Sequence, residues 1–269
     1  MKKVVLFDMD GTLTPARRAM PREVAEKLFM LHNRDIGIGI ISGSGMNYIL
    51  EQCDVFFKLY GERLTNLQIF PCNGTQYYNW DPKKCEPKMV YKNSIITELG
   101  REKLKNVLSC LLKYQLDLMH NYDFSDRLSY TGTFVDNRES LINWCPIGRN
   151  ANIHDRLIFE DLDEYFKIRR KFSDRLKSDP QFSGLTVKIG GATSFDIYPH
   201  GWDKTLPLLQ KTEQSNLKDC EIIFVGDRCE PGGNDYELYS YIQEKNSDNA
   251  YKTSGPDETI LIIDNILER

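Results

Sequence analysis

Two aspartates stand one residue apart directly after a short apolar run near the start of the chain. The run is VVLF (4–7), and the aspartates are Asp8 and Asp10. Such a run predicts a buried strand, and open α/β sheets bind ligands at the carboxyl ends of their strands. A calcium loop is excluded, because it needs Gly and Glu where this chain has Leu13 and Ala19. A ligand site, a turn and a helix cap remain as interpretations.

A second acidic group follows the apolar run EIIFVGD, which predicts a strand ending in Asp227. A glycine-rich turn then leads to Asn234 and Asp235. Carboxylates at two strand ends of one parallel sheet could converge on Mg²⁺, which takes one or two protein carboxylates together with water and substrate phosphate. Asp227 is therefore a candidate metal ligand. For Asp235, metal support and capping of the helix DYELYSYI both stay open.

Three further side chains could complete a phosphate site. Lys204 in GWDKTLPLLQ is expected at a helix start, where it could hold a transferring phosphoryl group and offset the crowded carboxylates. Ser42 and Ser44 in IISGSG follow a predicted strand and could donate a hydroxyl to the same phosphate. Either serine could instead be a helix N-cap.

Composition bounds the possible partners. The 269 residues carry a net charge of -4, so there is no basic excess to neutralise nucleic acid or an anionic membrane. The seven cysteines are odd in number and include no C-x-x-C pair, which favours free thiols in a reducing compartment over a zinc or redox site. No apolar run is long enough for a signal peptide or a membrane span. We expect a cytoplasmic protein with neither nucleic-acid nor membrane partners.

The elements that must position these residues follow two patterns. Strand-like and helix-like runs alternate over the first 60 residues, and the same pattern resumes with the strand before Asp227 and a helix that begins at Pro256. This alternation predicts a parallel α/β sheet. A polar stretch with an Asn-Gly turn and three prolines, residues 71–88, marks a boundary between the two parts.

The middle of the chain predicts an α+β layer on an antiparallel sheet, because two helical stripes and four strand-like runs lack βαβ alternation. The stripes are Leu104, Val107, Leu108, Leu111, Leu112, Leu116 and then Leu162, Tyr165, Phe166, Phe172, Leu176, and the runs are GTFVD, LINWCPIG, LTVKIGG and TSFDIYP. We predict a catalytic core over 1–84 and 201–269 and an inserted cap domain over 85–200.

Several of these motifs carry a family resemblance. FDMDGT, the serine after the second strand, the lysine of GWDK and GDRCEPGGND resemble the four motifs of the haloacid-dehalogenase (HAD) superfamily of phosphoryl-transfer enzymes. More narrowly, FDMDGTLTPAR, GTFVDNR, PIGR, GGATSFDIYPHGWDK and PGGND resemble the eukaryotic-type phosphomannomutases, in the same order along nearly the whole chain. The resemblance implies a HAD-like Rossmannoid core with a parallel sheet and an inserted α+β cap with an antiparallel sheet.

The resemblance also implies roles for the core residues. Asp8 would be the nucleophile that becomes an aspartyl phosphate, and Asp10 the general acid/base. Mg²⁺ would lie between Asp8, the backbone carbonyl of Asp10 and Asp227. Lys204 would belong to the same catalytic set.

In the cap, the resemblance implies binding of the sugar and of the phosphate that is not transferred. The implied phosphate ligands are Arg138, Arg149 and Arg156, with Arg17 near the domain junction. Each arginine alone could equally pair with a surface carboxylate. Strand alternation puts Ser194 and Asp196 on one face, which the resemblance assigns to sugar hydroxyls, while an ordinary half-exposed strand is the alternative.

Three functions are compatible with these residues. The leading one is interconversion of mannose 1-phosphate and mannose 6-phosphate, supplying GDP-mannose synthesis, with a hexose 1,6-bisphosphate activator, closure of the cap over the sugar, and a homodimer formed through the cap. The alternative is a Mg²⁺-dependent sugar-phosphate phosphatase of the same superfamily. A third is an inactive homologue that only binds sugar phosphate or a partner, which the intact set of Asp8, Asp10, Lys204 and Asp227 disfavours.

Overall fold

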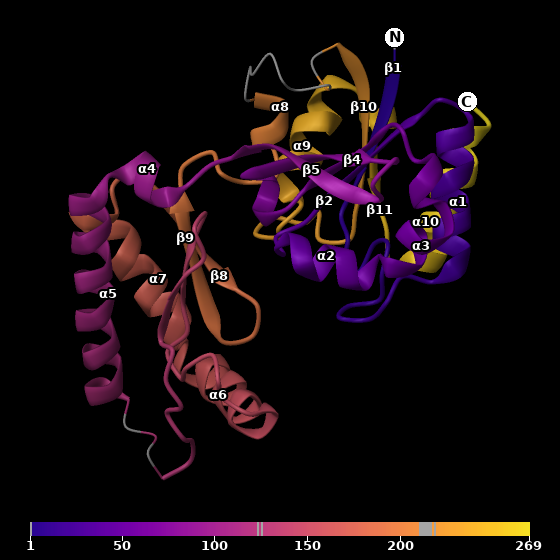
Figure 1. The fold of residues 1–269 in the computed structure, drawn as a ribbon. Helices are drawn as coiled ribbons and strands as arrows, with labels where there is room; N and C mark the ends of the chain where they lie inside the picture. Colours follow the sequence, from indigo (N-terminus) through magenta and orange to yellow (C-terminus); the bar gives the residue numbers. More distant parts are fainter. Residues whose placement is uncertain (1, 123, 125, 210–216, 218) are drawn as a thin grey trace. The chain divides into compact units, whose positions relative to one another are not determined.

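The computed structural model describes residues 2–122, 124, 126–209, 217 and 219–269, and the chain divides into two compact units (Figure 1). Unit 1 comprises Met1–Lys92 and Gly201–Arg269, and unit 2 comprises Asn93–His200. Unit 2 is thus an insertion in unit 1. We expected the first boundary after residue 84, whereas Glu86–Lys92 pairs with a strand of unit 1 and so belongs to that unit.

The described part of unit 1 is built on one seven-stranded sheet in the order β11-β10-β1-β2-β3-β4-β5. The neighbours from β11 to β3 pair in parallel, and β4 and β5 are antiparallel additions. Its strands are β1 (Lys2–Phe7), β2 (Gly37–Ile41), β3 (Leu67–Phe70), β4 (Gln76–Asp81), β5 (Glu86–Lys92), β10 (Cys220–Gly226) and β11 (Ala250–Lys252). Its helices are α1 (Arg22–Asn33), α2 (Met46–Gln52), α3 (Asp54–Tyr60), α8 (Leu206–Leu209), α9 (Tyr236–Lys245) and α10 (Pro256–Leu267), with 3₁₀ turns at Gly61–Arg63, Cys72–Gly74 and Ser247–Asn249.

Alternate residues of the parallel strands feed two separate cores, one on each face of this sheet. Val5 and Phe7 of β1 pack with α1, α2, α3 and α10, whereas Val4 and Leu6 pack with α9. Strands buried on both faces are apolar at nearly every position, which is why VVLF and IGIGII read as short continuous runs. Both faces of the sheet are thus covered by apolar packing.

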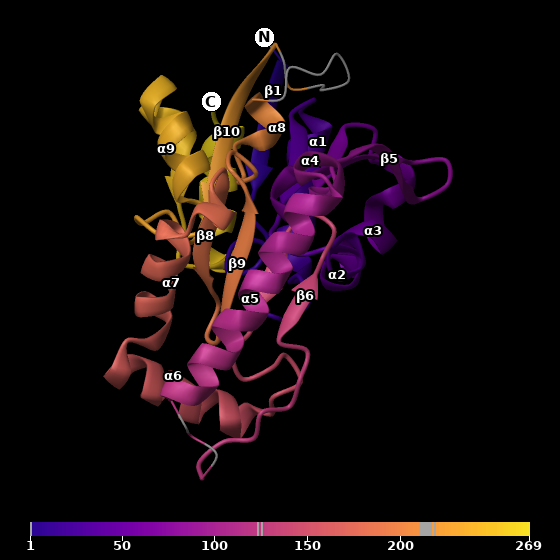
Figure 2. The same ribbon diagram turned by 90° about the vertical axis from the view of Figure 1, so that its left-hand side faces the viewer.

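The described part of unit 2 holds a four-stranded antiparallel sheet in the order β6-β7-β9-β8. The strands are β6 (Val135–Asn137), β7 (Ile142–Trp144), β8 (Leu185–Gly190) and β9 (Ser194–Pro199). The helices are α4 (Ile95–Leu99), α5 (Arg101–Asn121), α6 (Ile153–Phe166) and α7 (Ile168–Ser178), with a 3₁₀ turn at Pro180–Phe182. Figure 2 shows α5 and α7 running beside the strands. The predicted combination of a parallel core sheet and an antiparallel inserted sheet is confirmed.

One face of the unit 2 sheet packs against these helices. Trp144 stacks on Phe195 with ring centroids 4.7 Å apart, and the ring of Phe172 from α7 meets Trp144 edge-on at 5.8 Å. The indole N–H of Trp144 donates to the side chain of Gln115 on α5 at 2.7 Å, so its polar atom is satisfied in the core. The opposite face is therefore left to polar residues.

Two details of the inserted unit differ from expectation. The stripe predicted over 162–176 is not one helix, because Lys167 takes a left-handed φ of 53° and separates α6 from α7. Four of the stripe residues, Leu112, Leu116, Tyr165 and Phe166, are exposed on their helices. No helix in the described ranges combines the length and the apolar character needed to cross a bilayer.

Candidate active site

Asp8 and Asp227 lie side by side because they follow neighbouring parallel strands. In the register of β1 and β10, Phe7 stands opposite Val225, and the two aspartates come directly after these strands end. The backbone N–H of Asp8 donates to the carbonyl of Val225 at 2.9 Å, which extends the ladder into the site. Ser42 follows β2 at the same edge. The carboxyl edge of the sheet is therefore where the predicted core residues gather.

Lys204 is the centre of a buried charged cluster. Its ammonium donates hydrogen bonds to Oδ1 of Asp8 and, at 2.6 Å, to Oδ1 of Asp235. All three side chains are almost completely buried, Lys204 fully so. A buried ammonium needs partners to offset its lost hydration, and two carboxylates supply them here.

Asp235 does not act as a helix cap through its side chain. It stands at the N-cap position of α9 but makes no side-chain capping bond. Its Oδ2 instead accepts the backbone N–H of Arg228 at 3.0 Å, and its Oδ1 accepts the ammonium of Lys204. Its two oxygens are thus engaged by Lys204 and by the backbone of Arg228. The side chain does not cap α9, and metal support by Asp235 stays a prediction.

Three carboxylates could hold a cation. One oxygen each of Asp8, Asp227 and Asp235 lies within 4.8 Å of the others. Gly11 has a φ of +86°, and a Cβ at this position would lie 2.3 Å from Oδ2 of Asp227. The absence of a side chain at Gly11 therefore leaves room for the Asp227 carboxylate. Since Asp235 is committed to Lys204 and Arg228, the donor set that fits a hard divalent cation is chiefly Asp8 with Asp227.

The electrostatics of the cluster favour a bound cation. Burial raises the pKa of Asp8 to about 7, opposed by the charge of Lys204 and assisted by the neighbouring Asp235. Burial also raises the pKa of Asp227 to about 6, assisted by Asp235. Burial alone would lower the pKa of Lys204, but Asp235 and Asp8 raise it, so the ammonium stays charged. Crowded carboxylates of this kind gain most from added positive charge.

Asp10 occupies a distinct position, in the turn that follows β1. Its Oδ1 accepts two hydrogen bonds, from the backbone N–H of Arg17 and from the hydroxyl of Tyr48, each at 3.1 Å. Arg17 itself is exposed and has a left-handed φ of 58°. Burial and the nearby charge of Asp10 raise the pKa of the Tyr48 hydroxyl to about 12, so it remains a donor. Tyr48 was not among the residues predicted from the sequence.

The two serines differ in their surroundings. The hydroxyl oxygen of Ser42 is buried and accepts the backbone N–H of Ser44 at 3.0 Å, while Ser44 is partly exposed. Neither caps α2, whose N-cap is Gly45. Ser44 is therefore the more accessible of the two serines.

Two asparagines beside this loop were not predicted as site residues. A Cβ at Gly43 would lie 3.3 Å from Oδ1 of Asn73 and 3.5 Å from Nδ2 of Asn234, so both amides face the loop between the serines. Asn73 takes a left-handed φ of 58° in the Asn-Gly turn, and its buried Oδ1 has no partner within the described residues. The turn signal in PCNGT was visible in the sequence, but not what it faces.

In unit 2, two of the three predicted arginines share one aspartate. Asp136 on β6 accepts the guanidinium of Arg138 at 2.9 Å and lies 3.7 Å from that of Arg149. Burial and the neighbouring charge of Arg138 lower the pKa of Arg149. Two cations that share one carboxylate leave positive charge in excess. That excess suits a doubly charged anion such as phosphate.

A ladder of polar residues crosses the face of this sheet opposite Trp144. Asn143 stands directly opposite Asp136 on one side and Asp196 on the other. Its buried amide donates to Oδ1 of Asp196 at 2.7 Å and accepts Nη1 of Arg149 at 3.0 Å. Ser194, two residues before Asp196 on β9, is buried and paired in register with Gly190. Asn143 thus joins one predicted sugar residue, Asp196, to one predicted phosphate residue, Arg149.

Arg156 is held differently from the other two arginines. Its guanidinium donates to the carbonyl oxygens of Ala151 and Arg149 at 3.0 and 2.7 Å and to the hydroxyl of Thr193 at 2.9 Å. Three of its five N–H groups are thereby committed, which leaves two for a ligand. Arg156 therefore also fixes the loop that carries Arg149.

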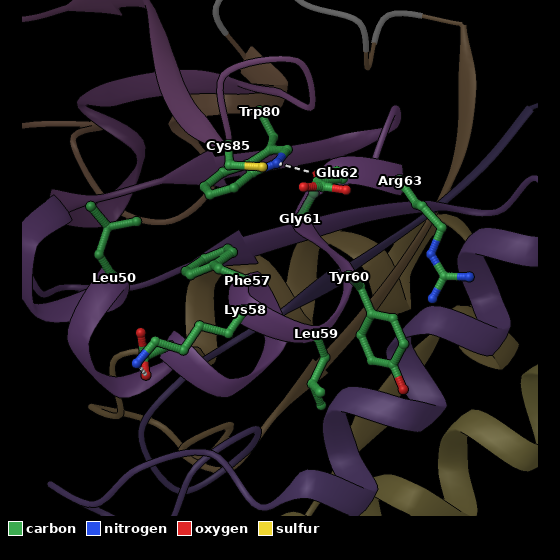
Figure 3. Close-up of a pocket in the computed structure, with 11 residues that line it drawn as sticks. Leu50, Phe57, Lys58, Leu59, Tyr60, Gly61, Glu62, Arg63, Trp80 and Cys85 are labelled. Atoms are coloured by element: carbon green, nitrogen blue, oxygen red, sulfur yellow. Dashed lines mark hydrogen bonds and ion pairs between the residues drawn. The ribbon is translucent and has the colours of Figure 1, made fainter.

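A hollow of about 570 Å³ elsewhere in unit 1 contains none of the predicted site residues. It is lined by α3, the turn Gly61–Arg63 and the β4–β5 hairpin, with Trp80 and Phe57 among its walls (Figure 3). The Trp80 indole donates to the carbonyl of Gly61 at 2.9 Å. The candidate site therefore lies at the carboxyl edge of the sheet and does not include this hollow.

Comparison with known proteins identifies related sequences over almost the entire chain. A family model described as "Eukaryotic phosphomannomutase" matches residues 24–269. The phosphomannomutase of Saccharomyces cerevisiae is 37% identical over 265 residues, which cover 97% of this chain and 92% of that protein. The phosphomannomutase of Drosophila melanogaster is 36% identical over 267 residues, covering 98% and 95%.

Solved structures add a similarity of fold. A haloacid dehalogenase-like hydrolase from Bacteroides thetaiotaomicron superposes with a TM-score of 0.58 at 17% identity, covering 99% of this chain and 100% of that one. At this identity the similarity concerns the fold alone. It agrees with the parallel core sheet and its insertion.

Proposed function

Because the chain belongs to the eukaryotic phosphomannomutase family, we propose that it interconverts mannose 1-phosphate and mannose 6-phosphate through an aspartyl phosphate on Asp8. The observation that carries this proposal is the buried contact of Asp8 with Lys204 at the carboxyl end of β1, beside Asp227. A carboxylate held in this way is an oriented nucleophile. The family is one of metal-dependent phosphotransferases, and phosphoryl transfer is a reaction in which such a nucleophile can take part.

The proposed step starts from a hexose 1,6-bisphosphate. A carboxylate oxygen of Asp8 attacks phosphorus, the bond between phosphorus and one sugar oxygen breaks, and Asp10 gives that oxygen its proton. The bisphosphate is rebuilt when the other hydroxyl of a hexose monophosphate attacks the aspartyl phosphate and Asp10 takes its proton. Proton transfer of this kind is worth about 10²- to 10⁴-fold in rate. Lys204 would offset negative charge throughout, and Ser44 would donate to the phosphoryl oxygens.

Mg²⁺ fits the oxygen donors of this site. Asp8 and Asp227 would hold it, together with the backbone carbonyl of Asp10 that the family pattern implies. When bound, the cation neutralises carboxylate charge and so permits attack on an anionic phosphate. Asp235, committed to Lys204, would keep the ammonium in place beside the cation instead of binding it directly.

Mutase activity requires that a second phosphate be held while the first is transferred. The arginines of unit 2 supply that charge, since Arg138 and Arg149 share the single carboxylate of Asp136. Asp196 and Ser194, next to them on β9, would contact sugar hydroxyls. A phosphatase needs only one phosphate site, so this cluster favours the mutase.

Further parts of the proposal rest on the family alone or on single features. Hexose 1,6-bisphosphate as activator follows from the cycle above, and cap closure over the sugar would protect the aspartyl phosphate from water. A homodimer through the inserted unit is supported by exposed apolar side chains on α5, where Leu112 and Leu116 are 55% and 58% exposed. A role in supplying GDP-mannose synthesis and a cytoplasmic location stay predictions.

The proposal is tested by following mannose 1-phosphate with phosphorus NMR in the presence of Mg²⁺ and a trace of glucose 1,6-bisphosphate. We expect mannose 6-phosphate with little inorganic phosphate. In an Arg138→Ala, Arg149→Ala variant, the yield of mannose 6-phosphate should fall at least about tenfold relative to phosphate released. Inorganic phosphate as the main product of the wild type would instead identify a phosphatase.

A further inference from the structure

Asp10 has two chemically unequal oxygens. Both described donors, the backbone N–H of Arg17 and the Tyr48 hydroxyl, converge on Oδ1 at 3.1 Å. No described residue donates to Oδ2. Donors concentrated on one oxygen fix the position of that oxygen and leave Oδ2 without a described donor. Only that oxygen remains to exchange a proton with a substrate.

The two donors are anchored in different ways. The N–H of Arg17 belongs to a residue in the left-handed region, which is strained for a side chain other than glycine and is held only because its surroundings determine it. The hydroxyl of Tyr48 comes from the first turn of α2, and its ring packs against the core that α1, α3 and α10 share. Tyr48 therefore connects the polar turn at Asp10 to the hydrophobic core on one face of the sheet.

From this geometry we infer that Tyr48 is a positioning residue for the acid/base Asp10: its hydroxyl holds Oδ1 so that Oδ2 faces the reacting sugar oxygen. The inference rests on the proposed function of Asp10. Tyr48 itself takes no part in bond making, and its effect passes through the orientation of one carboxylate. Misplacing a catalytic group lowers the rate of the chemical step more than it lowers ground-state binding.

The test compares Tyr48→Phe with the wild type. Phenylalanine keeps the ring in the core and removes only the hydroxyl, so the thermal unfolding midpoint should fall by only a few degrees. We expect kcat for hexose-phosphate turnover to fall about tenfold, the loss typical of one hydrogen bond to a charged group, with KM changed by less than about twofold. Tyr241→Phe is the matched control, because it removes a hydroxyl that accepts only from Lys245 on the surface of α9, and its kcat should equal that of the wild type.

Two results would overturn the inference. If kcat of Tyr48→Phe equals that of the wild type, the ring merely packs. If KM rises while kcat is preserved, Tyr48 contacts the substrate instead of positioning Asp10. Asp10 would act as acid/base both in isomerisation and in phosphate release. The kcat of Tyr48→Phe can therefore be compared with that of the wild type for whichever reaction the wild type catalyses. If the proposed mutase function is wrong, the wild type will release inorganic phosphate as its main product. If only the inference about Tyr48 is wrong, the wild-type product will be as proposed and the kinetic constants of Tyr48→Phe will not follow the expectation.

Discussion

The buried ammonium of Lys204 donates a hydrogen bond to the carboxylate of Asp8, although 196 residues separate the two in the chain. The whole insertion and several strands lie between them in sequence. The contact exists because β1 ends at Phe7 and the chain re-enters unit 1 at Gly201, both beside the carboxyl edge of one sheet. The charge of Lys204 opposes the effect of burial on the pKa of Asp8, the proposed nucleophile.

Replacing Lys204 with methionine should damage both stability and turnover. The change leaves Asp8 and Asp235 buried without their common partner, and breaking a buried pair in this way costs about 3–5 kcal/mol. Turnover should fall by about 10²-fold or more, since a fixed charge at the reacting phosphate is lost. Chemical denaturation in EDTA and steady-state rates measure the two effects. Lys252→Met, which removes a surface pair with Glu230, is the control and should leave both unchanged.

The stability of the metal-free protein should decrease as pH rises. In the folded state the pKa of Asp8 is raised by burial to about 7 and that of Asp227 to about 6, against an ordinary value of 3.8. Groups with raised folded-state pKa values contribute stability that is complete below the unfolded value and lost as pH rises through the folded values. In EDTA, the thermal midpoint should therefore drop most steeply between about pH 4 and pH 7, that is, between the unfolded and folded pKa values.

An Asp8→Asn variant provides the control for that titration. Its amide cannot ionise, so the drop between these pH values should become shallower. A midpoint of the wild type that climbs with pH across this window would mean that the carboxylates are not destabilised by burial.

The affinity for Mg²⁺ should show the opposite dependence on pH. Binding requires Asp8 and Asp227 to be deprotonated, so protons are released when the cation binds. Calorimetric titration of the protein with MgCl₂ should give an apparent affinity that weakens as pH falls through the pKa of about 7. Heats that vary with the ionisation enthalpy of the buffer would report the released proton. An affinity independent of pH would place the cation elsewhere.

Gly11→Ala should weaken Mg²⁺ binding specifically. A Cβ at Gly11 would lie 2.3 Å from Oδ2 of Asp227 and force that carboxylate to move, so we expect an apparent affinity reduced by about tenfold or more, the scale on which displaced ligand geometry acts. Gly100→Ala shares a left-handed φ, +76°, but has open space for the methyl group. It should lose a little stability and keep its affinity for Mg²⁺. Equal Mg²⁺ affinities in the two variants would show that Asp227 is not a ligand of the cation.

Asn143→Leu tests the polar ladder of unit 2. The change removes the bonds to Asp196 and Arg149 and leaves both charged groups with fewer partners. We expect the KM for mannose 1-phosphate to rise about tenfold and the free energy of unfolding to fall by about 1–3 kcal/mol. Steady-state kinetics and urea denaturation measure these quantities. An unaltered KM would show that the ladder does not serve the substrate.

Much of the site in unit 1 could be predicted, because the position of a residue at a strand end indicates where it lies in the sheet. Parallel strands place their carboxyl ends at one edge, so apolar runs ending in Asp8 and Asp227 were expected to meet, and they do. The pairing of Asp235 with Lys204 could not be chosen over helix capping, since both interpretations use the same N-cap position. The two interpretations differ only in where the Asp235 side chain points, and the amino-acid sequence does not give that direction.

Other features depend on packing between segments that are distant in sequence. Nothing in GMNYILEQC indicates that Tyr48 reaches Asp10, because that contact depends on how α2 is seated on its sheet. The stripe over 162–176 looked continuous, since Lys167 carries no helix-breaking signal, yet its left-handed backbone divides it. The stretch 71–88 is polar and rich in turns, but Tyr77 and Trp80 bury their rings and bring β4 and β5 into the core sheet.

The central claim is that Asp8, held by Lys204, accepts a phosphoryl group from a hexose 1,6-bisphosphate. The most direct test mixes the protein with glucose 1,6-bisphosphate and Mg²⁺, quenches it in acid within one turnover, and measures the mass of the peptide that contains Asp8. The prediction is one added phosphoryl group on that peptide, absent from the Asp8→Asn variant. An unmodified peptide from protein that still turns over hexose phosphates would contradict it.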